Sequence, residues 1–301
     1  MKVINNILDL VGNTPMLRLN HISDGSIFAK AEFLNPGGSI KDRVANWIIS
    51  EAERTGELKP GSTIIEATSG NTGIGVAFVG KIKGYKVIIV MPEDMSEERK
   101  KIIAALRAEL VLTSKEESIA GSVEKANKLA AVIPGSFLVR QFENPQNPEI
   151  HYLQTGPEIW NNLDGKIDAF VAGVGSGGTI GGVGKYLKEK NRNIHIVAVE
   201  PANSAALLGH EPGLHVIQGI GDGFVPPVLD VSLIDEVITV TDDDAIAMTR
   251  KLAGKEGILA GTSSGANVWA SIKVHEKLGP GKHVVTVLPD RAERYFSTSL
   301  L

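Results

Sequence analysis

The feature that most constrains the fold of this chain is a regular alternation of short β-branched apolar runs with segments of helical period. "STIIEAT" precedes a glycine turn and "GIGVAFVGKIKG", "KVIIVMP" precedes "SEERKKIIAALRAEL", and "DAFVAGVG" precedes "TIGGVGKYLKEK". The apolar runs are nearly continuous, which is typical of parallel strands buried on both faces. The pattern therefore predicts an α/β fold of parallel-rich sheets covered by helices on both faces.

The chain is also long enough to form two lobes, since 301 residues can make two domains of ordinary size. Residues 140–160 hold three prolines and no strand pattern, so we expect a loop-rich domain junction there. We predict a smaller N-terminal α/β domain over 35–145, with a mobile part at about 80–125. The larger C-terminal α/β domain would combine 1–34 with 146–301, with ligands bound in the cleft between the lobes.

Composition excludes several classes of function. The absence of cysteine excludes disulfides, thiolate metal sites and cysteine nucleophiles. A net charge of −4 with scattered basic residues gives no sign of nucleic acid or membrane as partner, and the basic cluster Arg99–Lys101 is expected to be solvated helix surface. None of the seven histidines has metal-ligand spacing, so no metal site is expected. Without a cleavable signal or a membrane-length apolar run, we expect a cytoplasmic location.

A glycine-rich turn follows the run "DAFVAGV" and opens a helix. Its glycines Gly173, Gly175 and Gly178 satisfy G-x-G-x-x-G, and Glu200 ends the next predicted strand, close to the ~20-residue spacing of a dinucleotide fingerprint. The same backbone N–H groups would suit a single phosphomonoester equally well. The candidate phosphate-binding residues are Gly175, Ser176, Gly177, Gly178 and Thr179. Both a nucleotide and a compact phosphate group remain open at this point.

A second pattern, Gly261 to Gly265, matches the nucleophile elbow G-x-S-x-G around Ser263. Hydrolases of that type place an acid and then a histidine after the serine. Here His275 and His283 both precede Asp290, and no histidine follows it. The order of these residues argues against a hydrolase.

The stretch "EATSGNTGIG", residues 66–75, passes from a strand through hydroxyl, amide and glycine residues into a helix. An N-cap would explain one such polar residue but not Thr68, Ser69, Asn71 and Thr72 together. Their side chains and the helix terminus can donate hydrogen bonds to a carboxylate. We predict a carboxylate-binding loop.

The stretch "NPGGSIKDR", residues 35–43, places Lys41 where a turn becomes a helix. Desolvation and the helix dipole lower the pKa of such an amine from ~10.4 and make it nucleophilic. Together with a carboxylate loop and a phosphate cup, this lysine indicates an amino-acid enzyme that forms a Schiff base with pyridoxal phosphate. Asp42 and Arg43 are expected to position the turn.

Ordered motifs along nearly the whole chain carry a resemblance to a known family. The sequence resembles the cysteine synthase (O-acetylserine sulfhydrylase) and cystathionine β-synthase family, of the tryptophan-synthase-β fold type. The resemblance implies a two-lobed pyridoxal-phosphate fold of type II, a homodimer and, in some relatives, docking of the C-terminal peptide of serine acetyltransferase. The motifs that carry it are "LVGNTPMLRL", "NPGGSIKDR", "EATSGNTGIG", "QFENPQNPEIH", "TGPEIW", "GVGSGGTIGG", "GIGDGF", "GTSSGA" and "ERYFSTSLL".

The resemblance also implies roles for individual residues. Lys41 would hold the cofactor and then shuttle the substrate α-proton, while Asn71 would bind the cofactor's 3′-oxygen. Ser263 would face the pyridine nitrogen, where a hydroxyl tolerates a neutral ring suited to β-elimination. The residues 175–179 would hold the phosphate. The substrate would be bound by Thr68, Ser69, Asn71, Thr72, Gln141, Gly219 and Asp222, and its carboxylate would close the small lobe.

The implied reaction is β-replacement through an α-aminoacrylate, with O-acetyl-L-serine and sulfide giving L-cysteine and acetate. Asp222 replaces a small residue common in the family: either it is a solvated turn residue, or it is a general base that lets water add, so that cysteine yields serine and hydrogen sulfide. "LPDRAERY" leans toward cystathionine synthases, so homocysteine is a further candidate acceptor. A nucleotide-dependent oxidoreductase is the remote alternative.

Overall fold

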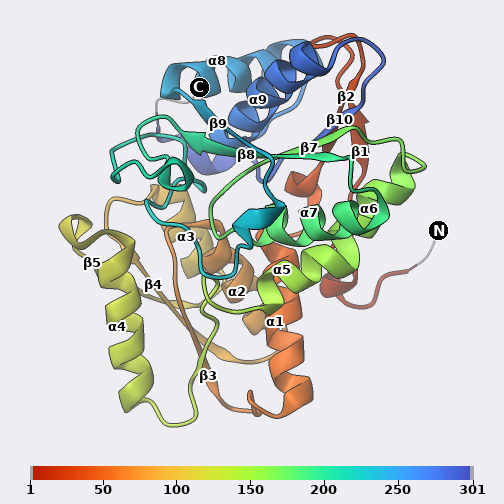
Figure 1. The fold of residues 1–301 in the computed structure, drawn as a ribbon. Helices are drawn as coiled ribbons and strands as arrows, with labels where there is room; N and C mark the ends of the chain where they lie inside the picture. The colour runs from red at the N-terminus through yellow and green to blue at the C-terminus, as the bar shows by residue number, and fades with distance from the viewer. Residues whose placement is uncertain (1–2, 299–301) are drawn as a thin grey trace.

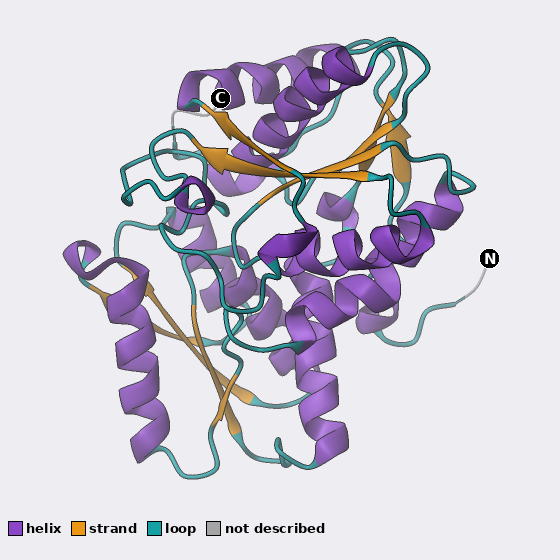
Figure 2. Cartoon of the chain, in the orientation of Figure 1, coloured by secondary structure: helices purple, strands orange, loops and turns teal. Residues whose placement is uncertain are grey.

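The computed structural model describes residues 3–298, and its helices and strands form two α/β layers stacked one above the other (Figures 1 and 2). The last residues of the "ERYFSTSLL" motif, 299–301, lie outside the described residues. Within 3–298, no helix has both the length and the apolar character needed to cross a membrane. The predicted α/β class, with parallel-rich sheets and helices on both faces, is confirmed.

The larger sheet has six strands, and all neighbouring pairs are parallel except the edge pair β1–β2. Alternate residues of its central strands face opposite helices. Val171 and Val197 pack toward α8 (Asp242–Lys251) and α9 (Thr262–Leu278), whereas Phe170 and Ile196 pack toward α6 (Gly156–Asn162) and α7 (Gly178–Lys190). Both faces of the sheet are therefore buried, as the continuous apolar runs predict. In spatial order the strands are β1 (Met16–Arg18), β2 (Ile27–Lys30), β10 (Val284–Val287), β7 (Ala169–Gly173), β8 (His195–Pro201) and β9 (Glu236–Val240).

The smaller sheet has four parallel strands. Ile64 packs with residues of α1 and α2 on one face, and Ile65 packs with Ala126 of α4 on the other. In spatial order the strands are β5 (Glu109–Thr113), β4 (Lys86–Pro92), β3 (Thr63–Ala67) and β6 (Phe137–Leu138). The division at 35–145 and the mobility of 80–125 remain predictions.

Nine α-helices are assigned within the described residues. Four of them, α1, α2, α7 and α9, start at the edge where strands of the two sheets end. The helices are α1 (Lys41–Thr55), α2 (Asn71–Ile82), α3 (Glu97–Ala105), α4 (Ser118–Val132), α5 (Gln146–Ile150), α6 (Gly156–Asn162), α7 (Gly178–Lys190), α8 (Asp242–Lys251) and α9 (Thr262–Leu278).

The expectation of a loop-rich junction over 140–160 is wrong for most of that segment. Residues 146–162 form α5, a π-helical turn (His151–Thr155) and α6 without a break. Pro145 is the N-cap of α5 and Pro148 lies in its first turn, where backbone N–H groups have no intrahelical partner anyway. The prolines therefore do not break this helix.

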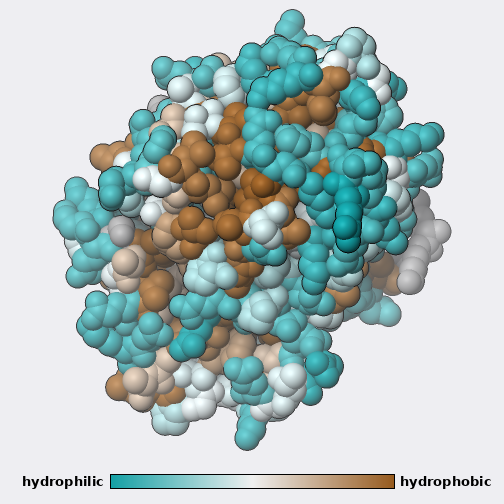
Figure 3. Space-filling model, in the orientation of Figure 1, coloured by the Kyte–Doolittle hydropathy of each residue, from teal (hydrophilic) through white to brown (hydrophobic). Residues whose placement is uncertain are grey.

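Large apolar side chains are exposed along the segment that joins β8 to β9. On the face drawn in Figure 3, hydrophobic side chains gather around the centre, while the lower part and the right edge are mostly hydrophilic. The exposed apolar residues of this connection are Leu208, Leu214, Val216, Phe224, Val225 and Val231. We call them the apolar connection.

Candidate active site

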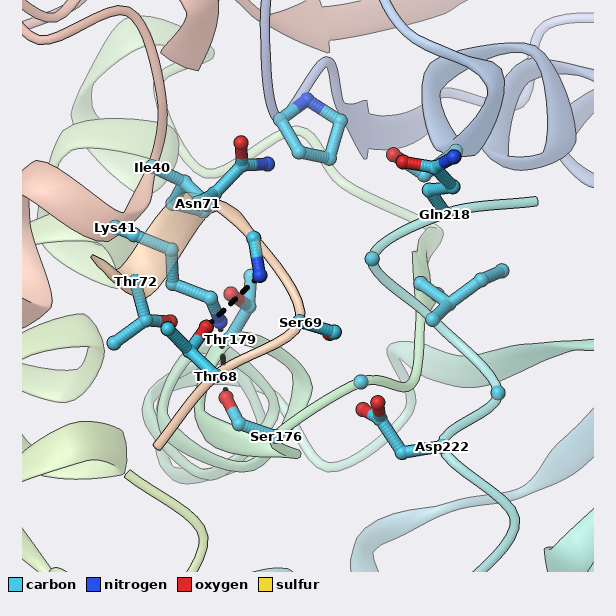
Figure 4. A pocket seen from close by; sticks show the side chains of 18 of the residues that line it. Ile40, Lys41, Thr68, Ser69, Asn71, Thr72, Ser176, Thr179, Gln218 and Asp222 are labelled. Carbon is cyan, nitrogen blue, oxygen red and sulfur yellow. Dashed lines mark hydrogen bonds between the residues drawn. The ribbon is translucent and has the colours of Figure 1, made fainter. Parts of the chain in front are cut away.

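A cavity of about 220 Å³ opens where strands of both sheets end (Figure 4). Its wall is formed by segments between Ile40 and Pro289 that are distant in sequence. Of the predicted site residues, Gly178 is absent from its wall. Those that line it are Lys41, Thr68, Ser69, Asn71, Thr72, Gln141, Gly175, Ser176, Gly177, Thr179, Gly219, Asp222 and Ser263.

Lys41 is the first residue of α1, and its Nζ donates a hydrogen bond of 2.9 Å to Ser176 Oγ, drawn as a dashed line in Figure 4. Burial lowers the pKa of Lys41 to about 8, although the carboxylates of Asp222 and Glu66 act in the opposite direction. The uncharged, nucleophilic form of this amine is therefore far more populated near neutral pH than it is for an ordinary lysine.

Two buried contacts hold the turn that presents Lys41. Asp42 Oδ2 accepts the N–H of Gly37 at 2.6 Å. Arg43 is buried and pairs with Glu32 at 2.8 Å and with Glu158 at 2.7 Å. These contacts fix the start of α1, in line with the positioning role expected for both residues.

The loop after β3 is tied to residues 140–141. Thr72 donates to Gln141 Oε1 at 2.6 Å, and the buried carboxyl group of Glu66 accepts the N–H groups of Arg140 at 2.9 Å and Gln141 at 3.3 Å. Burial raises the pKa of Glu66 to about 8. The hydroxyl and amide groups of this loop thus face the cavity from a fixed backbone.

Asn71 is supported by residues near the C-terminus that the sequence did not connect with it. Its Nδ2 donates to Asp290 Oδ2 at 2.7 Å, and Arg294 donates to its Oδ1. Tyr295 also donates to Asp290 Oδ2, at 2.5 Å. Asp290 lies 219 positions from Asn71, so only the fold brings the two together.

The glycine turn before α7 forms a cup at the helix N-terminus. A Cβ atom at Gly175 would lie 2.3 Å from the carbonyl oxygen of Gly219, and Gly177 has a φ of +78°. Only glycine fits both positions, which leaves the backbone N–H groups accessible to an anion. With the amine of Lys41 next to Ser176 of the cup, this donor set fits the phosphate and the aldehyde of pyridoxal phosphate.

The acid expected for a dinucleotide site lies elsewhere. Glu200 is buried, and both its oxygens accept the N–H of Leu207, at 3.2 and 3.1 Å. It is not among the residues that line the cavity. Glu200 therefore does not supply the ribose contact that a dinucleotide fingerprint assigns to this acid.

Ser263 and Asp222 reach the cavity from other segments. Ser263 lies in the first turn of α9, and Asn267 one turn later accepts the N–H of Gly173 at 2.8 Å and donates to Val287 at 2.9 Å. Asp222 follows the glycine loop; burial raises the pKa of its carboxyl group, while Lys41 and His215 oppose that shift. Asp222 is half-buried, and its carboxyl group lies in the cavity wall.

Sequence analysis missed several residues of the cavity wall, among them Met95, Arg99, Phe142, His215 and Gln218. The expectation that Arg99 is solvated is wrong: its side chain is 1% exposed and donates to Gln218 and to Tyr295. Gln218 directly precedes the predicted site residue Gly219, so its position next to the glycine loop could have identified it. No sequence signal could have identified Arg99, because its hydrogen-bond partners are more than 100 residues away.

The fold and the cavity define a two-sheet α/β protein with a buried lysine, a loop of hydroxyl and amide residues and a glycine-rich helix N-terminus in one cleft. Residues 7–290 match the model of the family described as "Pyridoxal-phosphate dependent enzyme". The chain belongs to this family, and its cofactor is pyridoxal phosphate. A cofactor with a single phosphate group agrees with the compact-phosphate interpretation of the glycine turn.

Individual relatives are similar over their whole length. A cysteine synthase of Staphylococcus aureus is 52% identical over 303 residues, covering 99% of this chain and 97% of the relative. An O-acetylserine dependent cystathionine β-synthase from Helicobacter pylori has a TM-score of 0.95 and 42% identity, covering 100% of this chain and 99% of that one. A hydrogen sulfide-producing enzyme from Fusobacterium nucleatum has a TM-score of 0.95 and 41% identity, covering 98% and 100%.

Proposed function

We propose that the protein is a cysteine synthase that replaces the acetoxy group of O-acetyl-L-serine with sulfide. The observation that carries this proposal is the single cavity that joins the amine of Lys41, the loop 68–72 and the cup 175–179. The 52% identity with a cysteine synthase over nearly the whole chain supports it.

Each element has a defined task in this proposal. Bound pyridoxal phosphate supplies an electron sink for charge that develops at the substrate Cα. The Nζ of Lys41 takes the α-proton, because burial lowers its pKa to about 8 and so makes the neutral amine accessible near neutral pH. Thr68, Ser69, Thr72 and Gln141 orient the substrate carboxylate.

The cofactor is held by residues on both sides of the cleft. Asn71 contacts its 3′-oxygen, Ser263 faces its ring nitrogen, and the N–H groups of 175–179 bind its phosphate. Asp290 and Arg294 fix the orientation of the Asn71 amide by bonding both its ends. This preorganisation supports the assignment of Asn71 to the cofactor.

Product analysis tests the proposal. The purified holoenzyme is supplied with O-acetyl-L-serine and sulfide, and cysteine and acetate are measured; borohydride treatment with peptide mapping locates the cofactor. We expect stoichiometric cysteine and acetate, and label on Lys41. Label on another residue, or no cysteine from this pair of substrates, would contradict the proposal.

A second candidate function follows from Asp222, whose carboxyl group lies in the cavity wall with a raised pKa. As a general base it would activate water, so that L-cysteine yields L-serine and hydrogen sulfide. The same chemistry with homocysteine as acceptor would give cystathionine. The similarity to a hydrogen sulfide-producing enzyme and to a cystathionine β-synthase supports water and homocysteine as candidate acceptors.

Asp222→Asn separates these activities. We expect it to lower serine formation from cysteine by at least about 10-fold, because the amide cannot accept a proton from water. Cysteine formation from O-acetyl-L-serine and sulfide should change far less, since sulfide needs no base to be nucleophilic. Unchanged serine formation would remove Asp222 from the mechanism.

We also propose a homodimer, closure of the part at about 80–125 over the substrate, and a cytoplasmic location. The apolar connection between β8 and β9 supports a protein contact on that face. A C-terminal peptide of serine acetyltransferase is a candidate ligand of the open cleft. Light scattering measures the oligomeric state. Titration with the C-terminal peptide of serine acetyltransferase measures whether that peptide binds.

A further inference from the structure

The helical segment α5 and the π-helical turn after it run directly behind the phosphate cup. A Cβ at Gly182 of α7 would lie 2.1 Å from the carbonyl oxygen of Pro148, and a Cβ at Gly178 would lie 2.0 Å from Asn147 Oδ1. The glycines of α7 thus allow its backbone to approach α5 closely. This explains why Gly178 belongs to the motif without lining the cavity.

Asn147 connects the cup with the substrate-carboxylate segment. Its side chain is fully buried, and its Nδ2 donates to the carbonyl oxygen of Gln141 at 2.8 Å and to Ser176 Oγ at 3.0 Å. Ser176 Oγ also accepts from Lys41 Nζ at 2.9 Å. A serine hydroxyl has two lone pairs and one hydrogen. In the cofactor-free protein both lone pairs are used; when Lys41 holds the cofactor, the Asn147 amide remains the donor that keeps the Ser176 O–H turned away from itself.

His151, one turn after Asn147, contacts the hydroxyl group of Thr179, as Asn147 contacts the hydroxyl group of Ser176. It is fully buried, with Nδ1 2.9 Å from Thr155 Oγ1 and Nε2 3.4 Å from Thr179 Oγ1. Burial, together with the charges of Lys41 and Arg43, lowers the pKa of His151 well below its ordinary value, so the ring is neutral and carries one N–H.

The partner of Thr155 decides which ring nitrogen holds that hydrogen. Across residues 3–298, His151 is the one hydrogen-bond partner of the buried Thr155 hydroxyl. A buried hydroxyl hydrogen needs an acceptor, so Thr155 donates to Nδ1. The N–H is then on Nε2 and faces Thr179 Oγ1, which leaves the O–H of Thr179 free to point into the cup.

We propose that Asn147 and His151 are positioning residues that direct the hydroxyl hydrogens of Ser176 and Thr179 at the cofactor's phosphate. The proposal rests on the proposed function only in placing that phosphate in the cup. It adds two side-chain donors, set in advance, to the backbone N–H groups. Neither residue touches the substrate, so the effect belongs to cofactor binding rather than to the choice of amino acid.

The test compares pyridoxal phosphate with pyridoxal, which lacks the phosphate, as ligands of protein from which the cofactor has been removed. Asn147→Asp replaces the donating amide with a group that only accepts, so Ser176 must turn its O–H toward it. His151→Leu removes the donor to Thr179, whereas His151→Gln retains an amide N–H at similar reach. Circular dichroism and thermal unfolding without cofactor check that each variant folds.

We expect Asn147→Asp and His151→Leu each to raise the Kd for pyridoxal phosphate by about 10-fold or more, because hydrogen bonds to a charged group are lost. The Kd for pyridoxal should change less than about 2-fold, and His151→Gln should retain most of the affinity. In a Ser176→Ala background, the effect of Asn147→Asp should largely disappear, because the hydroxyl that it redirects is absent.

Several results would overturn the inference: equal losses for both ligands, no loss for either, or no rescue by His151→Gln. If Asn147→Asp does not fold, the two His151 variants decide the matter. Wild-type protein that fails to bind pyridoxal phosphate would instead refute the proposed function. Normal binding by all variants would refute the positioning role alone.

Discussion

The guanidinium group of Arg99 lies over the ring of Tyr295, with its central carbon 4.9 Å from the ring centroid, and its Nη2 donates to the tyrosine hydroxyl at 3.1 Å. Arg99 belongs to α3, beside the smaller sheet, whereas Tyr295 lies near the C-terminus and bonds to Asp290. This contact therefore joins the segment predicted to move to the residues that hold Asn71.

Arg99→Leu should weaken the contact between α3 and the C-terminal segment that contains Tyr295. We expect the free energy of unfolding to fall by about 1–3 kcal/mol, because a cation–π contact and buried hydrogen bonds are lost. Hydrogen exchange over 97–105 should become faster. Lys101→Leu, at an exposed position of the same helix, is the control and should change stability by less than about 0.5 kcal/mol. Equal changes in the free energy of unfolding for the two substitutions would argue against a stabilising contact between Arg99 and Tyr295.

Gly175→Ala tests the contact between the cup and the next loop. The added Cβ would lie 2.3 Å from the Gly219 carbonyl oxygen, so one loop must move, and we expect the affinity for pyridoxal phosphate to fall by at least about 10-fold. Gly184→Ala in α7 is the matched control, since its nearest neighbour would be Ile196 at 3.4 Å. That change should leave cofactor affinity intact and add up to ~1 kcal/mol of helix stability. Normal affinity in Gly175→Ala would show that the cup tolerates a side chain.

The pKa of Lys41 can be followed by its reactivity with formaldehyde and cyanoborohydride in cofactor-free protein. Methylation requires the neutral amine, so its rate at Lys41 should rise with pH around a midpoint of about 8. Lys128 is a reference, because Glu124 raises its pKa above the ordinary value. Asp222→Asn removes a negative charge that raises the pKa of Lys41, so its midpoint should move lower. Peptide mass mapping measures both rates, and a midpoint shared with Lys128 would contradict the burial of this amine.

Glu66 predicts a pH dependence of stability. Burial raises its pKa in the folded state from 4.5 to about 8, so the folded protein binds more protons than the unfolded chain between these values. Its favourable contribution is complete below pH 4.5 and is lost as the pH rises through about 8. Urea unfolding at several pH values should show this fall in the wild type and a shallower one in Glu66→Gln. Parallel curves would mean that Glu66 does not titrate in this range.

Much of the site is predictable because it consists of local patterns. Lys41, Asn71, the 175–179 turn and Ser263 each lie where a strand or turn leads into a helix, and glycine, hydroxyl and amide residues mark such positions. The carboxyl ends of parallel strands meet at one edge of a sheet, so these local signals converge without further information.

The supporting residues are not predictable in this way. Asp290 and His151 lie in stretches that the sequence marks as motifs, but they act through partners that only the folded chain brings near, so the motifs alone did not indicate their roles. The helical structure of 146–162 was hidden for a related reason. Its prolines are tolerated in a first turn, and the burial of Asn147 and His151 against the glycines of α7 overrides their weak helix propensity.

The close approach of Gly175 and Gly219 restricts how this enzyme can acquire new acceptors. Remodelling the main chain of 219–223 would also displace the turn that we propose as the cofactor's anchor, so insertions or deletions there are expected to reduce catalysis before selectivity changes. Exchange of the side chain at 222 leaves that anchor in place. A directed-evolution library should therefore vary this one position first.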